Sequence, residues 1–248
     1  MQAPLIGRHV VRLESVTSTN DVAFELAERG ALEGTVVLAD VQTRGRGRQG
    51  RPWHAAPHTS VLLSAILRPL PSCQRPTLLT AMAAVAAYET IASHSGLAVL
   101  ITWPNDIYLS RGKVCGILIE QRHSVWVIGI GINVNQTALE LRASALPEAI
   151  SLRAACNREF STEIVAADLM QHLDSQYNEV LRGNHEHVLQ KWVTAMRILG
   201  SQVEVHHPDG EAIGRLLAID FDELKLETPA GRAVTFNLNH VQAILPVV

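Results

Sequence analysis

Residues 42–53 read Gln42-Thr43-Arg44-Gly45-Arg46-Gly47-Arg48-Gln49-Gly50-Arg51-Pro52-Trp53. They lie between two apolar runs, residues 34–39 and 60–67, each of which predicts a buried strand. Four arginines cannot be packed in a hydrophobic core, but their guanidinium groups suit phosphate and carboxylate oxygens. The three glycines leave backbone N–H groups open to an anion. The segment therefore predicts an anion-binding loop at the end of a strand.

The charge of this region differs from that of the whole chain. The protein has 248 residues, a formal charge of −3 and an isoelectric point near 6.4, so it is not a general binder of polyanions. No acidic residue occurs between Asp40 and Glu89. The positive charge is therefore local, as expected for a pocket that holds an anion.

Cysteine usage and hydropathy indicate where the protein works. Its three scattered cysteines, Cys73, Cys115 and Cys156, form no C-x-x-C pair and favour a reducing, cytoplasmic setting. The longest apolar run, residues 78–88, is far shorter than the roughly 20 residues that a membrane span needs. We expect neither secretion nor a membrane partner.

Periodicity predicts an α+β fold, with a mixed β-sheet and helices packed on it in residues 1–198. The expected strands are residues 9–13, 34–39, 60–67, 97–102, 107–109, 114–121 and 125–130. The expected helices are residues 21–29, 77–93, 161–181 and 187–196. From about residue 201 the pattern changes to short alternating strands and turns. Residues 199–248 therefore predict a small β-barrel or sheet.

The loop fails two standard nucleotide-binding tests. Gly45-x-Gly47-x-x-Gly50 matches the dinucleotide fingerprint formally, but Pro52 and a polar segment follow where a helix should begin. A Walker phosphate loop is absent from the sequence. On composition alone, a solvated basic turn and a nucleic-acid patch both remain open.

Five motifs occur in order along the chain. They are Ser18-Thr19-Asn20, the loop 42–53, Trp103-Pro104-Asn105-Asp106, Gly112-Lys113-x-x-Gly116-Ile117-Leu118-x-Glu120, and Gly129-x-Gly131-x-Asn133-x-Asn135. Together they resemble the motif series of biotin protein ligases. The resemblance spans nearly the whole chain, and it implies a class II synthetase-like catalytic fold followed by an SH3-like barrel.

The resemblance implies an ATP-dependent ligase with two acyl-transfer steps. The biotin carboxylate would attack the α-phosphate of ATP to form biotinyl-5′-AMP and pyrophosphate. A lysine of a biotin carboxyl carrier domain would then accept the biotin. ATP and biotin are the implied substrates, with Mg²⁺ accompanying ATP and no tightly bound protein metal.

The resemblance also assigns residues to these ligands. Lys113 and Arg48 would be catalytic, and Asp106 would lie by the magnesium ion. The biotin-binding set would be Ser18, Thr19, Asn20, Gln42, Arg46, Gly47, Arg48, Lys113 and Gly116. The ATP and adenylate set would be Arg46, Arg48, Arg51, Trp53, Asn105 and Asn133. Taken singly, Ser18-Thr19-Asn20 would be a helix cap and Lys113 a lysine at the tip of a hairpin.

Two departures from the family pattern carry expectations. Thr102 stands where the family usually has lysine, so Arg46, Arg48 and Lys113 should carry more of the phosphate binding. Only 17 residues precede Ser18, so we expect no DNA-binding repressor domain and no DNA partner. A homodimer through an edge of the main sheet is open by analogy with the family.

Two other functions remain as alternatives. A lipoate or octanoate ligase or transferase would share the fold and would use lipoate in place of biotin. A non-catalytic nucleic-acid-binding module would bind through the basic loop, with an affinity that falls steeply as salt rises.

Overall fold

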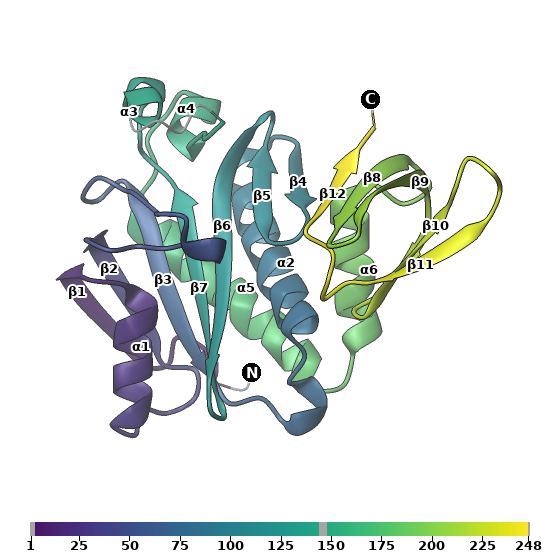
Figure 1. The fold of residues 1–248 in the computed structure, drawn as a ribbon. Helices are drawn as coiled ribbons and strands as arrows, with labels where there is room; N and C mark the ends of the chain where they lie inside the picture. Colours follow the sequence, from purple (N-terminus) through teal and green to yellow (C-terminus); the bar gives the residue numbers. More distant parts are fainter. Residues whose placement is uncertain (1–2, 144–147, 248) are drawn as a thin grey trace.

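The computed structural model describes residues 3–143 and 148–247, and its larger part is a seven-stranded sheet in the order β1-β2-β3-β7-β6-β5-β4 (Figure 1). The β1–β2 pair is parallel and the remaining pairs are antiparallel. The predicted mixed sheet is confirmed. The strands are β1 (Val10–Val16), β2 (Val36–Gln42), β3 (Ser60–Leu67), β4 (Val99–Thr102), β5 (Asp106–Leu109), β6 (Gly112–Arg122) and β7 (Val125–Asn133).

Helices cover the two faces of this sheet unequally. Helix α1 (Thr19–Glu28) packs on one face against β2, β3 and β7, whereas α2 (Pro76–Ser95), α5 (Thr162–Leu181) and α6 (His185–Met196) lie on the other (Figure 1). Short helices α3 (Ala138–Ala143) and α4 (Leu152–Cys156) follow β7. The face that carries α1 therefore retains an area of sheet, over β5, β6 and part of β7, that no long helix covers.

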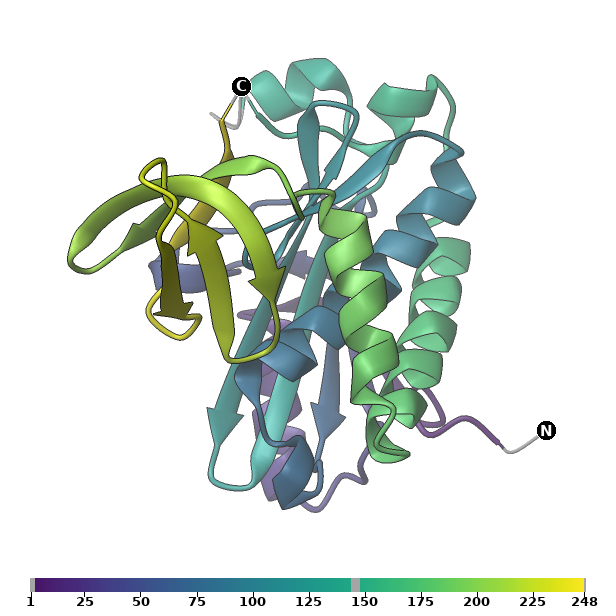
Figure 2. The ribbon, with the colours of Figure 1, turned by 90° about the vertical axis from the view of Figure 1, so that its right-hand side faces the viewer.

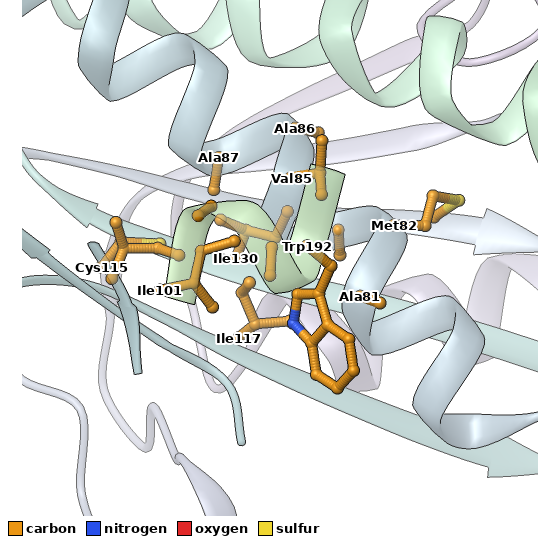
Figure 3. Close-up of a cluster of buried hydrophobic side chains, with 14 of the residues drawn as sticks. Ala81, Met82, Val85, Ala86, Ala87, Ile101, Cys115, Ile117, Ile130 and Trp192 are labelled. Carbon is orange, nitrogen blue, oxygen red and sulfur yellow. The ribbon is translucent and has the colours of Figure 1, made fainter. Parts of the chain in front are cut away.

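The main core lies under α2. This helix is apolar on all sides, and it ends at Gly96, whose φ of 64° is the left-handed conformation that glycine adopts without strain. Figure 3 shows its side chains against the sheet and against Trp192 of α6. The residues that meet there include Ala81, Met82, Val85, Ile101, Cys115, Ile117 and Ile130. Close packing at this level holds the sheet rigid beneath its other face.

A second, five-stranded antiparallel sheet follows α6, in the order β11-β10-β9-β8-β12. Its strands are β8 (Gln202–His207), β9 (Gly210–Ile219), β10 (Glu223–Glu227), β11 (Ala233–Asn237) and β12 (Ala243–Pro246). Figure 2 shows that the sheet curves strongly. In the described residues β11 and β12 form its two edges, so the expected SH3-like barrel is an open one.

Three contacts fix the second sheet to the first. The indole Nε1 of Trp103 donates a hydrogen bond of 3.2 Å to the carbonyl of Val241. Trp103 and Phe221 pack against Trp192, with ring centroids 5.6 and 6.3 Å from it. Arg75, which precedes α2, forms an ion pair with Asp222. Because Trp103 follows β4 directly, the second sheet is held at one end of the first.

The hairpin between β5 and β6 differs from the prediction in one respect. The sequence places Gly112 and Lys113 in the turn, but the structure begins β6 at Gly112. The Lys113 N–H donates to the carbonyl of Glu148, and the Ile150 N–H donates to the carbonyl of Lys113. This added backbone pairing keeps Lys113 in the strand. Throughout the described chain, every helix is too short or too polar to cross a membrane.

Candidate active site

A cavity of about 740 Å³ lies on the sheet face that α1 only partly covers. Its walls are the start of α1, the arginine-glycine loop, β5 to β7, and residues 242–243 before and within β12. All fourteen residues assigned from the sequence line it: Ser18, Thr19, Asn20, Gln42, Arg46, Gly47, Arg48, Arg51, Trp53, Asn105, Asp106, Lys113, Gly116 and Asn133. Their separate segments therefore meet at one place.

The cavity is elongated along β6. Lys113 lies near one end of the strand and Leu118 five residues later, and both line the cavity. A strand rises roughly 3.3 Å per residue, so these positions are separated by about 17 Å. Such a length suits two substrates placed end to end better than one small ligand.

One end of the cavity is built from the buried start of α1. Ser18, Thr19 and Asn20 are only 3%, 4% and 3% exposed. Ser18 is the N-cap, yet its side chain caps no backbone N–H. The Thr19 N–H donates to Oε1 of Gln42 at 2.7 Å, which joins α1 to the end of β2. These polar groups are therefore placed for a ligand more than for helix capping.

The arginine-glycine loop forms a short hairpin over the cavity. The Gly47 N–H donates to the carbonyl of Arg51 at 2.7 Å, and the Trp53 N–H donates to that of Gly45 at 2.9 Å. At its tip, Gln49 and Gly50 have φ values of 55° and 71°. The positive φ at Gly50 is one that glycine adopts without strain. The two limbs of the loop are thus joined by backbone hydrogen bonds, and the arginines project from this hairpin.

The two central arginines of the loop have different surroundings. Arg46 donates to both oxygens of Asp21 at 2.9 Å and to Glu120 at 2.9–3.3 Å. Its hydrogen bond to Asp21 raises the pKa of Arg46 and lowers the pKa of Asp21. The assigned contact of Arg46 with phosphate stays a prediction, and it would require these ion pairs to open.

Arg48 has no such partner. Its guanidinium group lines the cavity and forms no ion pair or side-chain hydrogen bond with any residue that the structure describes. Burial lowers the pKa of Arg48 from its usual value, which nevertheless leaves an arginine charged at neutral pH. A half-buried cation without a partner is a strong site for an incoming phosphate or carboxylate.

Glycines on the cavity floor accommodate two of the assigned side chains. Gly116 and Gly131 are partners across β6 and β7, and a Cβ at Gly131 would lie 2.6 Å from the Trp53 indole. A Cβ at Gly129 would overlap the amide of Asn20. The indole Nε1 of Trp53 is enclosed and has no hydrogen-bond partner among the described residues. An acceptor on a ligand would satisfy it.

At the other end of the cavity, Lys113 Nζ lies 2.7 Å from Oδ2 of Asp106. Asp106 is the one carboxylate among the described lining residues. Asn105 Nδ2 donates to the carbonyl of Ile117, which leaves its Oδ1 as an acceptor. This end therefore offers a cation, a carboxylate and an amide oxygen within a few residues.

Asn133 lies at the end of β7 and is 4% exposed. Its Oδ1 accepts a hydrogen bond of 3.0 Å from Gln136 Nε2, which also donates to the Ser60 hydroxyl at 2.6 Å. The amide oxygen is held in this way, whereas the Nδ2 group of Asn133 donates to no residue that the structure describes. This group can bond an aromatic ring nitrogen.

Sequence reasoning gave no role to four polar residues that shape this site. Hydrogen bonds join Asn20 to Ser64 and Glu120, and join Arg46 to Asp21. Gln242 borders the cavity from the second sheet. A signal existed for Ser64, because it is the one polar residue inside the otherwise apolar stretch 61–67. No feature of the sequence indicated Gln242, because only the packing of the second sheet brings it to the cavity.

Among the described residues that line the cavity, few side chains could serve as ligands of a resident metal ion. The one cluster of metal-ligating side chains found among them is Glu204, His206 and Glu211, which lies on the second sheet. A divalent ion at Asp106 would need most of its ligands from a substrate, as Mg²⁺ does when it arrives with nucleotide phosphates.

Known proteins share both the sequence pattern and the fold. Residues 13–136 match the Biotin/lipoate A/B protein ligase family. The chain is 34% identical over 239 residues to the Bifunctional ligase/repressor BirA of Bacillus spizizenii, a match that covers 93% of this chain and 73% of that protein. It is 27% identical over 210 residues to the Biotin–[acetyl-CoA-carboxylase] ligase of Mycobacterium tuberculosis, covering 82% and 77% of the two chains.

Among solved structures, the biotin protein ligase from Aquifex aeolicus in complex with biotin and ATP is similar to this chain with a TM-score of 0.83. The similarity covers 97% of this chain and all of that one, at 23% identity. This likeness supports the fold.

Proposed function

Because the chain belongs to the Biotin/lipoate A/B protein ligase family, we propose that its cavity activates biotin with ATP and transfers it to a protein lysine. The chain is an ATP-dependent biotin protein ligase. The observation that carries this function is the buried polar end of the cavity, at Ser18, Thr19, Asn20 and Gln42.

This polar end favours biotin over lipoate. The ureido ring of biotin has two N–H donors and a carbonyl acceptor, which hydroxyl and amide groups can satisfy together. The dithiolane ring of lipoate has no such groups, so it would cover the remaining donors and acceptors of these side chains without bonding them. A site built to bond a polar group rejects an analogue that lacks it by factors of about 10⁴–10⁵ in favourable cases.

In the first step, an oxygen of the biotin carboxylate attacks the α-phosphorus of ATP. A P–O bond to the leaving pyrophosphate breaks, and a mixed anhydride with AMP forms. Both reactants are anions, so fixed cations must reduce their repulsion. We assign this role to Arg48, which has no partner in the cavity, and to Lys113, which can exchange Asp106 for a phosphate oxygen.

In the second step, the ε-amine of an acceptor lysine attacks the carbonyl carbon of the anhydride. The amine loses a proton, AMP leaves with the anhydride oxygen, and an amide bond to biotin remains. Water would compete for the same carbonyl, so the intermediate must be covered. The hairpin of the loop, closed by its own backbone hydrogen bonds, and the indole of Trp53 would exclude water there.

The remaining assignments belong to this proposal. Asn133 would donate to the adenine ring, and Arg51 and Asn105 would contact the adenylate. Mg²⁺ would be held mainly by ATP oxygens, with Asp106 as the protein ligand. The acceptor would be a biotin carboxyl carrier domain. A cytoplasmic location fits the three free thiols, while a homodimer and the absence of DNA binding stay predictions.

Biotin-dependent exchange between pyrophosphate and ATP tests the function directly. We expect exchange with biotin and at least about a hundredfold less with lipoate or octanoate, a lower bound on the 10⁴–10⁵ that such a site reaches in favourable cases. Exchange with lipoate and none with biotin would overturn the assignment. Binding to RNA or DNA that weakens steeply with salt and ignores biotin would favour a nucleic-acid module instead.

A further inference from the structure

Glu120 makes side-chain contacts with two segments that the proposed function uses separately. Its Oε2 accepts a hydrogen bond of 2.7 Å from Asn20 Nδ2, at the buried start of α1. The same carboxylate accepts from Arg46 of the loop, at 2.9–3.3 Å. Glu120 itself is not among the residues that line the cavity. It therefore supports groups that face the ligand without facing it.

The contact with Asn20 fixes the orientation of an amide. Ser64, which is fully buried, lies 2.5 Å from Asn20 Oδ1, and Glu120 lies at its Nδ2. A carboxylate can only accept hydrogen bonds, so it selects the orientation in which the amide nitrogen faces it. Gly129 leaves room for the amide on the sheet in this position. Glu120 and Ser64 thus fix the orientation of the Asn20 amide at the cavity wall.

The contact with Arg46 fixes the loop. Arg46 lies on the first limb of the loop hairpin, and its side chain reaches both Asp21 on α1 and Glu120 on β6. Arg122 adds a longer contact of 3.3 Å to Asp21 from the solvent side. These two carboxylates and two guanidinium groups form a balanced cluster. Loss of the Glu120 charge would leave the cluster with an excess positive charge beside Asn20.

We propose that Glu120 is a positioning residue that couples biotin binding at Asn20 to the attachment of the arginine-glycine loop through Arg46. The inference rests on the proposed function, because it takes Asn20 as a biotin contact. The phosphate-binding end, with Arg48 and Lys113, lies outside this network. Glu120 should accordingly influence biotin and the retained adenylate, and leave ATP binding nearly unchanged.

The test is the Glu120→Gln variant of the full chain, assayed by biotin-dependent pyrophosphate exchange. Glutamine has nearly the same volume, but its one oxygen cannot serve both Asn20 and Arg46, and its NH₂ group opposes their donors. We expect the KM for biotin to rise about tenfold, as for the loss of one charge-assisted hydrogen bond. Release of biotinyl-adenylate should become faster by a similar factor, while the KM for ATP changes by less than about twofold.

A matched control removes a similar ion pair elsewhere. Glu227 accepts from Arg215 at 3.0–3.1 Å on the second sheet. Glu227→Gln should leave both KM values and adenylate release unchanged. Arg46→Gln provides a second variant should Glu120→Gln fold poorly, and it should raise the KM for biotin and speed the release of biotinyl-adenylate in the same way. Its KM for ATP is not used as a criterion, because Arg46 is also assigned to the phosphate. The KM for biotin of the Glu120→Gln/Arg46→Gln double variant should lie within about twofold of that of the more impaired single variant, because both substitutions remove the Glu120–Arg46 interaction.

A rise of both KM values together, or a lower melting temperature with unchanged KM values, would mean that Glu120 acts only on stability and would overturn the inference. An unchanged biotin KM would do the same. Wild-type protein that shows no exchange with biotin would instead overturn the proposed function, and the inference with it.

Discussion

Lys113 and Asp106 form an ion pair of 2.7 Å across β5 and β6, at the end of the cavity opposite Asn20. Each is thus held by the other until a ligand enters. In the proposed function, an ATP molecule with its magnesium ion would offer both groups better partners, since phosphate oxygens suit the ammonium and the metal suits the carboxylate. The pair would then hold both side chains at the end of the cavity assigned to the phosphates.

Replacement of Lys113 by alanine should remove adenylation. We expect kcat for pyrophosphate exchange to fall by about 10²–10³, which is typical for the loss of one group that stabilises transition-state charge. The far-ultraviolet circular dichroism spectrum should not change. Lys191 is a matched control, because it pairs with Glu89 at 2.8 Å with a similar exposed fraction, 33% against 32%. A Lys113→Ala variant as active as Lys191→Ala would refute the role of Lys113.

An alanine at Gly131 should displace Trp53. The added Cβ would lie 2.6 Å from the indole ring, so the ring must move away from the floor of the cavity. Water should then reach the mixed anhydride, and the ratio of biotinyl-adenylate hydrolysed to biotin transferred should rise severalfold. Rapid-quench measurement of the intermediate gives this ratio.

The double variant Trp53→Ala with Gly131→Ala separates this effect from general damage to the sheet. It should behave like Trp53→Ala alone, because the clash has been removed. A double variant much less stable than either single variant would show that Gly131 matters for the strand itself.

Stability should depend on pH through Asp21. Its hydrogen bond with Arg46 lowers the pKa of this carboxyl in the folded protein below its usual value near 3.8. The ionised form therefore stabilises the fold above the unfolded-state pKa, and this contribution is lost as the pH falls through the lower folded-state pKa. The difference in unfolding free energy between wild type and Asp21→Asn should be constant from about pH 8 to pH 5 and should shrink below about pH 4.

Urea denaturation at several pH values measures this difference. Glu28→Gln is a suitable control, because Glu28 is exposed on the same helix and forms no ion pair or side-chain hydrogen bond with any residue that the structure describes. It should show little difference from wild type at any pH. A difference for Asp21→Asn that grows as the pH falls would have the opposite sign and would contradict the ion-pair explanation.

Thr102, which stands where the family usually has lysine, is a suitable position for an added positive charge. It is the last residue of β4 and the register partner of Asp106. A lysine there should lower the KM for ATP or raise the rate of adenylation by about fivefold, the effect of roughly 1 kcal/mol from one partly exposed charge. Thr102→Gln gives a long side chain without the charge and should have no such effect. If Thr102→Lys leaves both quantities unchanged, the compensation expected from Arg46, Arg48 and Lys113 is wrong.

The fold was predictable where local sequence decides it. The strand 60–67 is found as β3 with the same ends, and Gly96 ends α2 as its sequence position indicates. Helices α3 and α4 and strand β12 were missed. They are short, and β12 forms only by pairing with β8, about 40 residues earlier in the chain. Periodicity cannot indicate such partners.

The cavity was predictable as a set of residues but not as a set of contacts. The arginines of the loop indicated anion binding, yet Arg46 meets Asp21 and Glu120, which are 25 and 74 residues away in the chain. Only the three-dimensional arrangement distinguishes Arg46, which has two acidic partners, from Arg48. The same is true of Gly129 and Gly131, which make room for protein side chains and not directly for substrate.

The position of residues 242–243 beside the cavity has a practical consequence for fusion proteins. Strand β12 begins at Ala243 and ends at Pro246, whereas the N-terminal segment lies far from this strand (Figure 2). A partner attached after the last strand would directly follow a segment that borders the cavity. Affinity tags and reporter domains are therefore better placed before β1.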